Sequence, residues 1–150
     1  MNHHRWVATV LAATALVGCP TLLASCSSSG PSTHTTTGPP SASSPRTSVI
    51  APGGTVPFNP ADNARSEVEV GTCTEVSGAW KLSGSVHNAA KHAKNFQLVV
   101  DFVTKPGSTV LTTSVVTISG VGAGSTAPWS VSGAAGKSNV ACLLRQAQAN

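Results

Sequence analysis

Cysteine offers this chain its most versatile chemistry, because a thiol can pair as a disulfide, bind a metal or carry a covalent attachment. The 150-residue sequence holds four cysteines. Cys19 and Cys26 lie in the stretch LVGCPTLLASC, at the end of an apolar segment, whereas Cys73 and Cys142 lie far downstream. Two questions follow: which cysteine of the first pair is modified, and whether the second pair forms a disulfide.

The N-terminal segment has the three parts of an export signal. Residues 1–5 are short and basic, residues 6–24 are apolar, and small residues follow. A transmembrane anchor is the alternative, since a stretch of this length can just cross a bilayer. Gly18 and Pro20 interrupt such a helix, however. We therefore expect residues 1–25 to be a cleaved signal peptide.

Each cysteine of the first pair closes a lipobox-like tetrapeptide, LVGC for Cys19 and LASC for Cys26. These motifs resemble those of bacterial lipoproteins, in which the cysteine receives a diacylglycerol through a thioether and becomes the first mature residue. Lipidation at Cys26 removes Cys19 with the signal, whereas lipidation at Cys19 leaves Cys26 as an odd thiol. We predict lipidation at Cys26, with Cys19 as the alternative and a secreted protein without lipid as a further alternative.

Cys73 and Cys142 are predicted to form a disulfide, because an exported protein matures in an oxidising compartment. Closing a loop of about seventy residues would stabilise the fold by about 4 kcal/mol in the chain-entropy model. A redox or intermolecular role is the alternative. A metal site would need paired ligand spacing, which these cysteines lack, so we expect neither a metal nor another cofactor.

After Cys26 the composition changes to serine, threonine, glycine and proline. Nearly every residue between 27 and 48 is one of these four types. Such a segment cannot bury enough apolar surface to offset its ordering entropy. Residues 49–63 hold further prolines and glycines, so we expect a disordered tether over residues 26–65.

From residue 67 onward the pattern is typical of β-strands. Residues 80–87 alternate between apolar and polar side chains, and residues 96–103 are apolar on both faces, which predicts a central strand. Further strands are expected at residues 68–76, 109–119, 129–131 and 139–145. Six or seven short strands without a convincing helix predict one immunoglobulin-like antiparallel β-sandwich over residues 66–147. Trp80 and Trp129 are expected in its core.

Four basic residues gather where two of the expected strands are connected. His87, Lys91, His92 and Lys94 flank one loop. They are a weak candidate for a metal site or for contact with an anionic envelope glycan or lipid, and a solvated loop is the simpler interpretation.

Catalysis and nucleic-acid binding find little support in the sequence. No Gly-x-Ser-x-Gly elbow occurs, and acidic residues are few in the expected domain. Residues 133–138 end in Gly-Lys-Ser but lack the glycine spacing of a phosphate-binding loop. The net charge of +4 is dispersed rather than gathered into a stripe. We expect neither an enzyme nor a partner nucleic acid.

Several short motifs carry a second resemblance. GSVHN at residues 84–88, FQLVVDF at 96–102, a glycine turn at Gly107 and GSTAPW at 124–129 resemble the FxLYD-type and related immunoglobulin-like domains of bacterial surface proteins. The two downstream cysteines resemble the terminal cysteine pair of actinobacterial lipoproteins that carry such a domain. Ala123 stands where proline is usual. The resemblance implies an extracytoplasmic module without catalytic residues.

Two functions follow as expectations. The first is a lipid-anchored, non-enzymatic protein on the extracytoplasmic face of the cell membrane, whose sandwich contacts an envelope protein or glycan by its loops or by strand addition. The second is a structural envelope accessory or surface antigen with no dedicated ligand.

Overall fold

The fold, described for residues 42–150 by a computed structural model, is all-β as predicted. Seven strands and two short 3-10 helices follow one another in the order β1 (Arg46–Ile50), η1 (Pro60–Asp62), η2 (Arg65–Glu67), β2 (Val68–Val76), β3 (Ala79–His87), β4 (Lys94–Thr104), β5 (Val110–Val121), β6 (Thr126–Gly133) and β7 (Val140–Ala149). Within these residues, no helix is long and apolar enough to cross a membrane.

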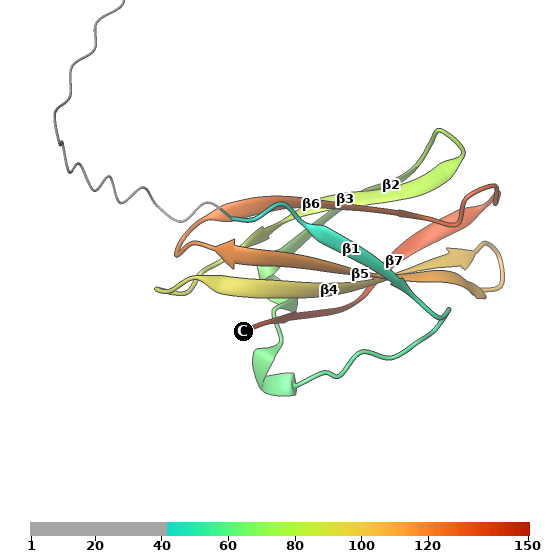
Figure 1. Cartoon of the computed structure of the whole chain (residues 1–150). Helices are drawn as coiled ribbons and strands as arrows, with labels where there is room; N and C mark the ends of the chain where they lie inside the picture. The colour runs from blue at the N-terminus through green and yellow to red at the C-terminus, as the bar shows by residue number, and fades with distance from the viewer. Residues whose placement is uncertain (1–41) are drawn as a thin grey trace, which may run out of the picture. The chain divides into compact units, whose positions relative to one another are not determined.

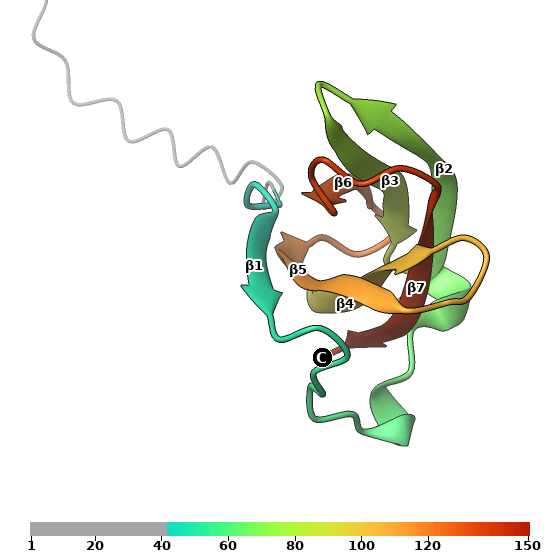
Figure 2. The same cartoon turned by 90° about the vertical axis from the view of Figure 1, so that its right-hand side faces the viewer.

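The strands form two antiparallel sheets that pack face to face as a β-sandwich (Figure 1). The four-stranded sheet has the order β1-β5-β4-β7, and the three-stranded sheet has the order β2-β3-β6. Figure 2 shows the same two layers after a quarter turn. β4 lies between β5 and β7, which confirms the prediction that the strand with apolar residues on both faces is central.

The core lies between the sheets and follows the predicted alternation. On the three-stranded side, Leu82 and Val86 are buried together with Trp129, which is 2% exposed. On the four-stranded side, the even-numbered residues of β4 between Phe96 and Phe102 are fully buried. Large apolar side chains at alternate positions therefore supply the burial that holds the two layers together.

A second set of apolar residues is buried on the opposite face of the four-stranded sheet. Val99, Val103 and Val115 are at most 6% exposed but do not belong to the core cluster between the sheets. The chain between β1 and β2 runs along this outer face (Figure 1), with Gly53 bonded to Thr113 of β5. This cover explains why β4 is apolar on both faces.

The predicted extent of the tether is wrong for its second half. β1 pairs with β5 from Arg46↔Thr117 to Ile50↔Thr113, and the N–H of Ser43 donates to the carbonyl of Ser119 at 3.0 Å. The folded region therefore begins about twenty residues earlier than composition indicated. The physical reason is that β1 is held mainly through its backbone, so its sequence needs no apolar alternation. The first part of the expected tether, residues 26–41, lies outside the described residues.

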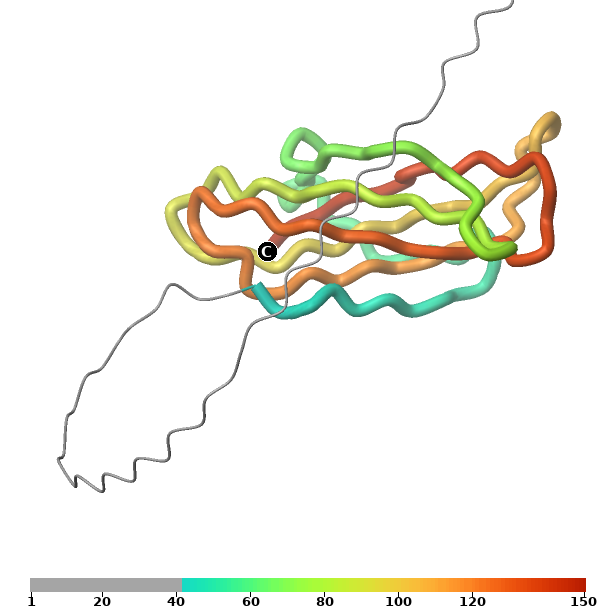
Figure 3. Tube along the Cα trace, turned by 90° about the horizontal axis from the view of Figure 1, so that it is seen from above, coloured from blue at the N-terminus to red at the C-terminus, as the bar shows by residue number. Residues whose placement is uncertain are grey.

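The strand connections gather at the two ends of the sandwich (Figure 3). Loops 88–93 and 122–125 lie at the end where β1 begins, which we call the near end. The β2–β3 hairpin and loops 105–109 and 134–139 lie at the opposite end, which we call the far end.

Candidate functional site

The predicted contact residues lie at the near end. His87 ends β3, and Lys91 and His92 are exposed on the loop that follows. Lys94, by contrast, begins β4, and its Nζ lies 3.0 Å from Oε1 of Glu67. Both of these side chains are mostly covered, at 21% and 16% exposure. The structure therefore places three of the four basic residues on the surface and the fourth in an internal ion pair.

Asn88 fixes the conformation of this loop. Its side chain is fully buried, and its Nδ2 donates to the carbonyls of His92 and Val121 at 2.8 Å and of Gly122 at 3.1 Å. Its Oδ1 accepts from the N–H of Ala90 at 2.9 Å. One amide therefore satisfies backbone groups on both near-end loops, as a buried polar group must.

Backbone hydrogen bonds of Asn88 join the same two loops. Its N–H donates to the carbonyl of Ser125 at 2.9 Å, and its own carbonyl accepts from Gly124 at 2.8 Å. Asn88 is the last residue of the GSVHN motif, and its role here is to hold the two near-end loops together. The loop that displays Lys91 and His92 is held in one conformation rather than free.

The histidines of this loop do not assemble a metal centre. Nδ1 of His87 lies 3.1 Å from Oγ1 of Thr126 on β6. Among residues 42–150, no three histidine, cysteine, aspartate or glutamate side chains are grouped so that they could hold a metal ion. What the near end offers is a small polar surface with hydrogen-bonding and cationic groups.

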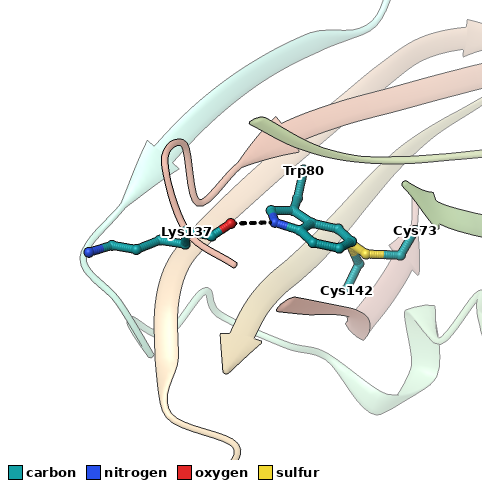
Figure 4. Close-up of a disulfide and its surroundings, with 4 residues drawn as sticks. All are labelled: Cys73, Trp80, Lys137 and Cys142. Atoms are coloured by element: carbon teal, nitrogen blue, oxygen red, sulfur yellow. Dashed lines mark hydrogen bonds between the residues drawn. A yellow bond between two sulfur atoms is a disulfide. The ribbon is translucent and has the colours of Figure 1, made fainter. Parts of the chain in front are cut away.

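The Cys73–Cys142 disulfide is present, as the sequence predicted. It joins β2 to β7, the edge strands of the two sheets on one side of the sandwich. The half-buried Trp80 is a diagonal cross-strand neighbour of Cys73, and Figure 4 shows its indole over the disulfide. Its Nε1 donates to the carbonyl of Lys137 at 2.8 Å. Trp80 therefore lies at the margin of the core, in which Trp129 is buried as expected.

The far end is also fixed by hydrogen bonds between loops. The backbone N–H of Gly136 donates to the carbonyl of Gly78 at 2.8 Å, and the backbone N–H of Lys105 donates to the carbonyl of Asn139 at 2.7 Å. Loop 134–139 therefore bonds to both of its neighbours. The three far-end connections form one ordered surface.

A buried polar cluster lies on the outer face of the four-stranded sheet, and sequence reasoning did not find it. Asp101 is 6% exposed; its Oδ1 accepts from Oγ1 of Thr113 at 2.6 Å, and its Oδ2 lies 3.2 Å from Nε of Arg145. The same threonine oxygen accepts from the N–H of Gly53 at 2.9 Å. The Arg145 guanidinium donates to the carbonyls of Gly53 and Gly54. We call these five residues the latch.

The latch holds a turn that the sequence placed in the tether. Residues 51–54 read Ala-Pro-Gly-Gly, the N–H of Gly54 donates to the carbonyl of Ala51 at 2.7 Å, and Gly53 has a φ of +69°. The Pro-Gly pair was the available signal for a turn. Its binding partners lie 60 and more residues downstream, where no local pattern reveals them.

Comparison of the chain with known protein families, curated proteins and solved structures gives no match. The role of these surfaces is therefore argued from their geometry.

Proposed function

We propose that this protein is a lipid-anchored, non-enzymatic module on the extracytoplasmic face of the cell membrane. The observation that carries the proposal is the pairing of Cys73 with Cys142. The folded domain uses these two cysteines, which leaves Cys19 and Cys26, each at the end of a lipobox-like tetrapeptide, for other chemistry. A structural disulfide also suits an oxidising compartment outside the cytoplasm.

The position of β1 determines which end of the sandwich an N-terminal anchor would hold near the membrane. Arg46 begins β1 at the near end, the end that displays His87, Lys91 and His92. In this proposal the segment of about twenty residues from Cys26 to β1 is the flexible tether that its composition predicts, and such a chain has a root-mean-square span of about 25 Å. In the proposed arrangement the near end stays close to the membrane, and the far end is presented to the envelope.

An interaction role is supported by the ordering of the loops at both ends. Loops held by hydrogen bonds lose little conformational freedom when they bind a partner. We assign contact with an envelope protein or glycan to these loop surfaces. His87, Lys91 and His92 are the contact candidates at the near end, and Lys105 and Lys137 are those at the far end.

A structural accessory without a dedicated ligand remains the second candidate. The observation that favours it is the distribution of the exposed large apolar residues over three strands and the connection between β1 and η1; these residues are Val49, Phe58, Val70, Val76 and Leu143. Protein-binding surfaces usually gather such residues into one patch.

The anchor is tested by expressing the full chain, Cys19→Ala and Cys26→Ala in a bacterium that processes lipoproteins. We expect the wild type and Cys19→Ala to partition into detergent and to carry the diacylglycerol mass. Cys26→Ala should lose both properties. A Cys26→Ala protein that keeps the lipid moves the site to Cys19, and a wild type without lipid overturns the anchor.

The interaction role is tested by chemical cross-linking and capture from envelope fractions. The wild type is compared with a Lys91→Glu/His92→Glu variant and with a Lys105→Glu/Lys137→Glu variant. A partner whose recovery falls at least fivefold in one variant but not in the other supports an interaction module and identifies the end that binds. Failure to enrich any partner favours the structural accessory.

A further inference from the structure

β1 is an edge strand with few buried side chains and with no disulfide bond to the rest of the sandwich. Four of its five residues are exposed, and Val49 is 67% exposed. Its pairing with β5 is its only strand pairing within the described residues. We infer that β1 is a removable strand, and that the β5 edge beneath it is a strand-acceptor site that a second copy of this chain fills with its own β1.

The attachment of β1 depends on the latch at its C-terminal end. Both sides of the glycine turn are gripped there, because Thr113 accepts from the N–H of Gly53 while Arg145 donates to the carbonyls of Gly53 and Gly54. Asp101 orients both of these partners through its two carboxylate oxygens. Breaking one small polar cluster therefore frees the turn and leaves β1 held by its backbone pairing alone.

Opening would expose a regular strand edge. β1 covers Thr113 to Thr117 of β5 in an unbroken register, and β5 contains no proline. An edge of this kind presents unpaired N–H and C=O groups that accept another strand. Once β1 has left, the three other strand edges, those of β2, β6 and β7, each carry an obstacle.

Those obstacles are of three kinds. β2 has a bulge between Val70 and Cys73, and β6 contains Pro128, which cannot donate a ladder hydrogen bond. β7 is covered by the chain before β2, where the N–H of Ala64 donates to the carbonyl of Ala147 at 3.1 Å and the Arg65 guanidinium donates to the carbonyl of Leu144. Strand addition is therefore directed to β5.

The β5 edge already fits the β1 strand of a second copy of this chain. The β1 of another molecule has the same sequence and makes the same pairing, so exchange replaces each lost contact by an equivalent one. The core and the Cys73–Cys142 disulfide take no part in the exchange. This inference goes beyond the loop contacts proposed above, and it is measured without reference to lipid.

Opening is tested by hydrogen exchange and mass spectrometry on the full chain in detergent. Thr113→Val removes the hydroxyl at the centre of the latch, and Gly53→Ala strains the turn at positive φ without touching the core, since its Cβ meets nothing within 4 Å. We expect residues 46–54 to exchange at least tenfold faster in both variants, while residues 96–103 keep their protection. The control is Glu69→Gln, an exposed carboxylate bonded only to Ser85.

Binding of an added strand to the β5 edge is tested with a fluorescent peptide of residues 42–54 and with a scrambled peptide as the control. We expect the native peptide, which keeps the unstrained turn, to bind Gly53→Ala at least tenfold more tightly than the wild type, and the dimer fraction of this variant to rise with concentration. Thr113→Val lacks the hydroxyl for either strand and therefore serves only in the hydrogen-exchange measurement. Unchanged exchange of residues 46–54, or equal loosening of the whole domain, overturns the latch. Faster exchange without peptide binding or dimers overturns the acceptor site. Neither result changes the lipid mass that tests the anchor.

Discussion

Replacing Asn88 by alanine removes the amide that joins the two near-end loops. The side chain donates both N–H hydrogens, shared among three carbonyls, and accepts one hydrogen bond from Ala90. At about 1 kcal/mol for each of three hydrogen bonds lost in a buried site, we expect a loss of about 3 kcal/mol. Domains of this size have a free energy of unfolding of about 5–15 kcal/mol, so the loss is large.

Urea denaturation followed by tryptophan fluorescence measures this loss. Asn95→Ala is the matched control, because its Oδ1 accepts a single hydrogen bond, from the N–H of Gly120, at an exposed position between β4 and β5, and we expect a loss below about 1 kcal/mol. Asn88→Asp provides a second comparison, because it replaces only the donating group and should be at least as destabilising as alanine at neutral pH. If Asn88→Ala lowers the free energy of unfolding by less than about 1 kcal/mol, Asn88 is not the residue that holds the two near-end loops together.

Two further predictions concern the core and the disulfide. Cys73→Ser/Cys142→Ser opens a loop with a sequence separation of 69 and should lower the free energy of unfolding by about 4 kcal/mol, measured in urea against the wild type under oxidising conditions; an unchanged midpoint would contradict a stabilising role. Gly84→Ala places a Cβ 2.1 Å from the carbonyl oxygen of Glu69 and 2.9 Å from the Trp129 ring, so we expect a loss of at least about 2 kcal/mol. The exposed Ser83→Ala is its control, and equal stability of these two variants would show that β2 moves aside at no cost.

The strands of the sandwich were predictable because their side chains alternate. In β3 and β4, the residues that face the core are large and apolar apart from Gly84, and this pattern is visible without any knowledge of partners. The central place of β4 also followed from its sequence, since a strand that is apolar on both faces must be covered on both. The sequence did not show that the chain between β1 and β2 covers the outer face of this strand.

β1 and the latch escaped prediction for a common reason. The sequence of β1 lies within a segment rich in serine, threonine and proline, and its exposed side chains give no apolar signal. The alternation of β4 assigned Asp101 to a face but not to a buried position. Its burial depends on Gly53 and Arg145, which meet it only in the folded chain. Composition separates a disordered tether from a docked turn poorly when the docking partner is distant in sequence.

The disulfide also determines what a protease can release. Loops 88–93, 105–109, 122–125 and 134–139 all lie between Cys73 and Cys142 in the sequence. A single cut in any of them leaves both fragments covalently joined, so the nicked domain stays connected to its N-terminal segment. Shedding of the intact sandwich requires cleavage before Cys73, and the chain before β1 is where such a cut would leave every strand in place.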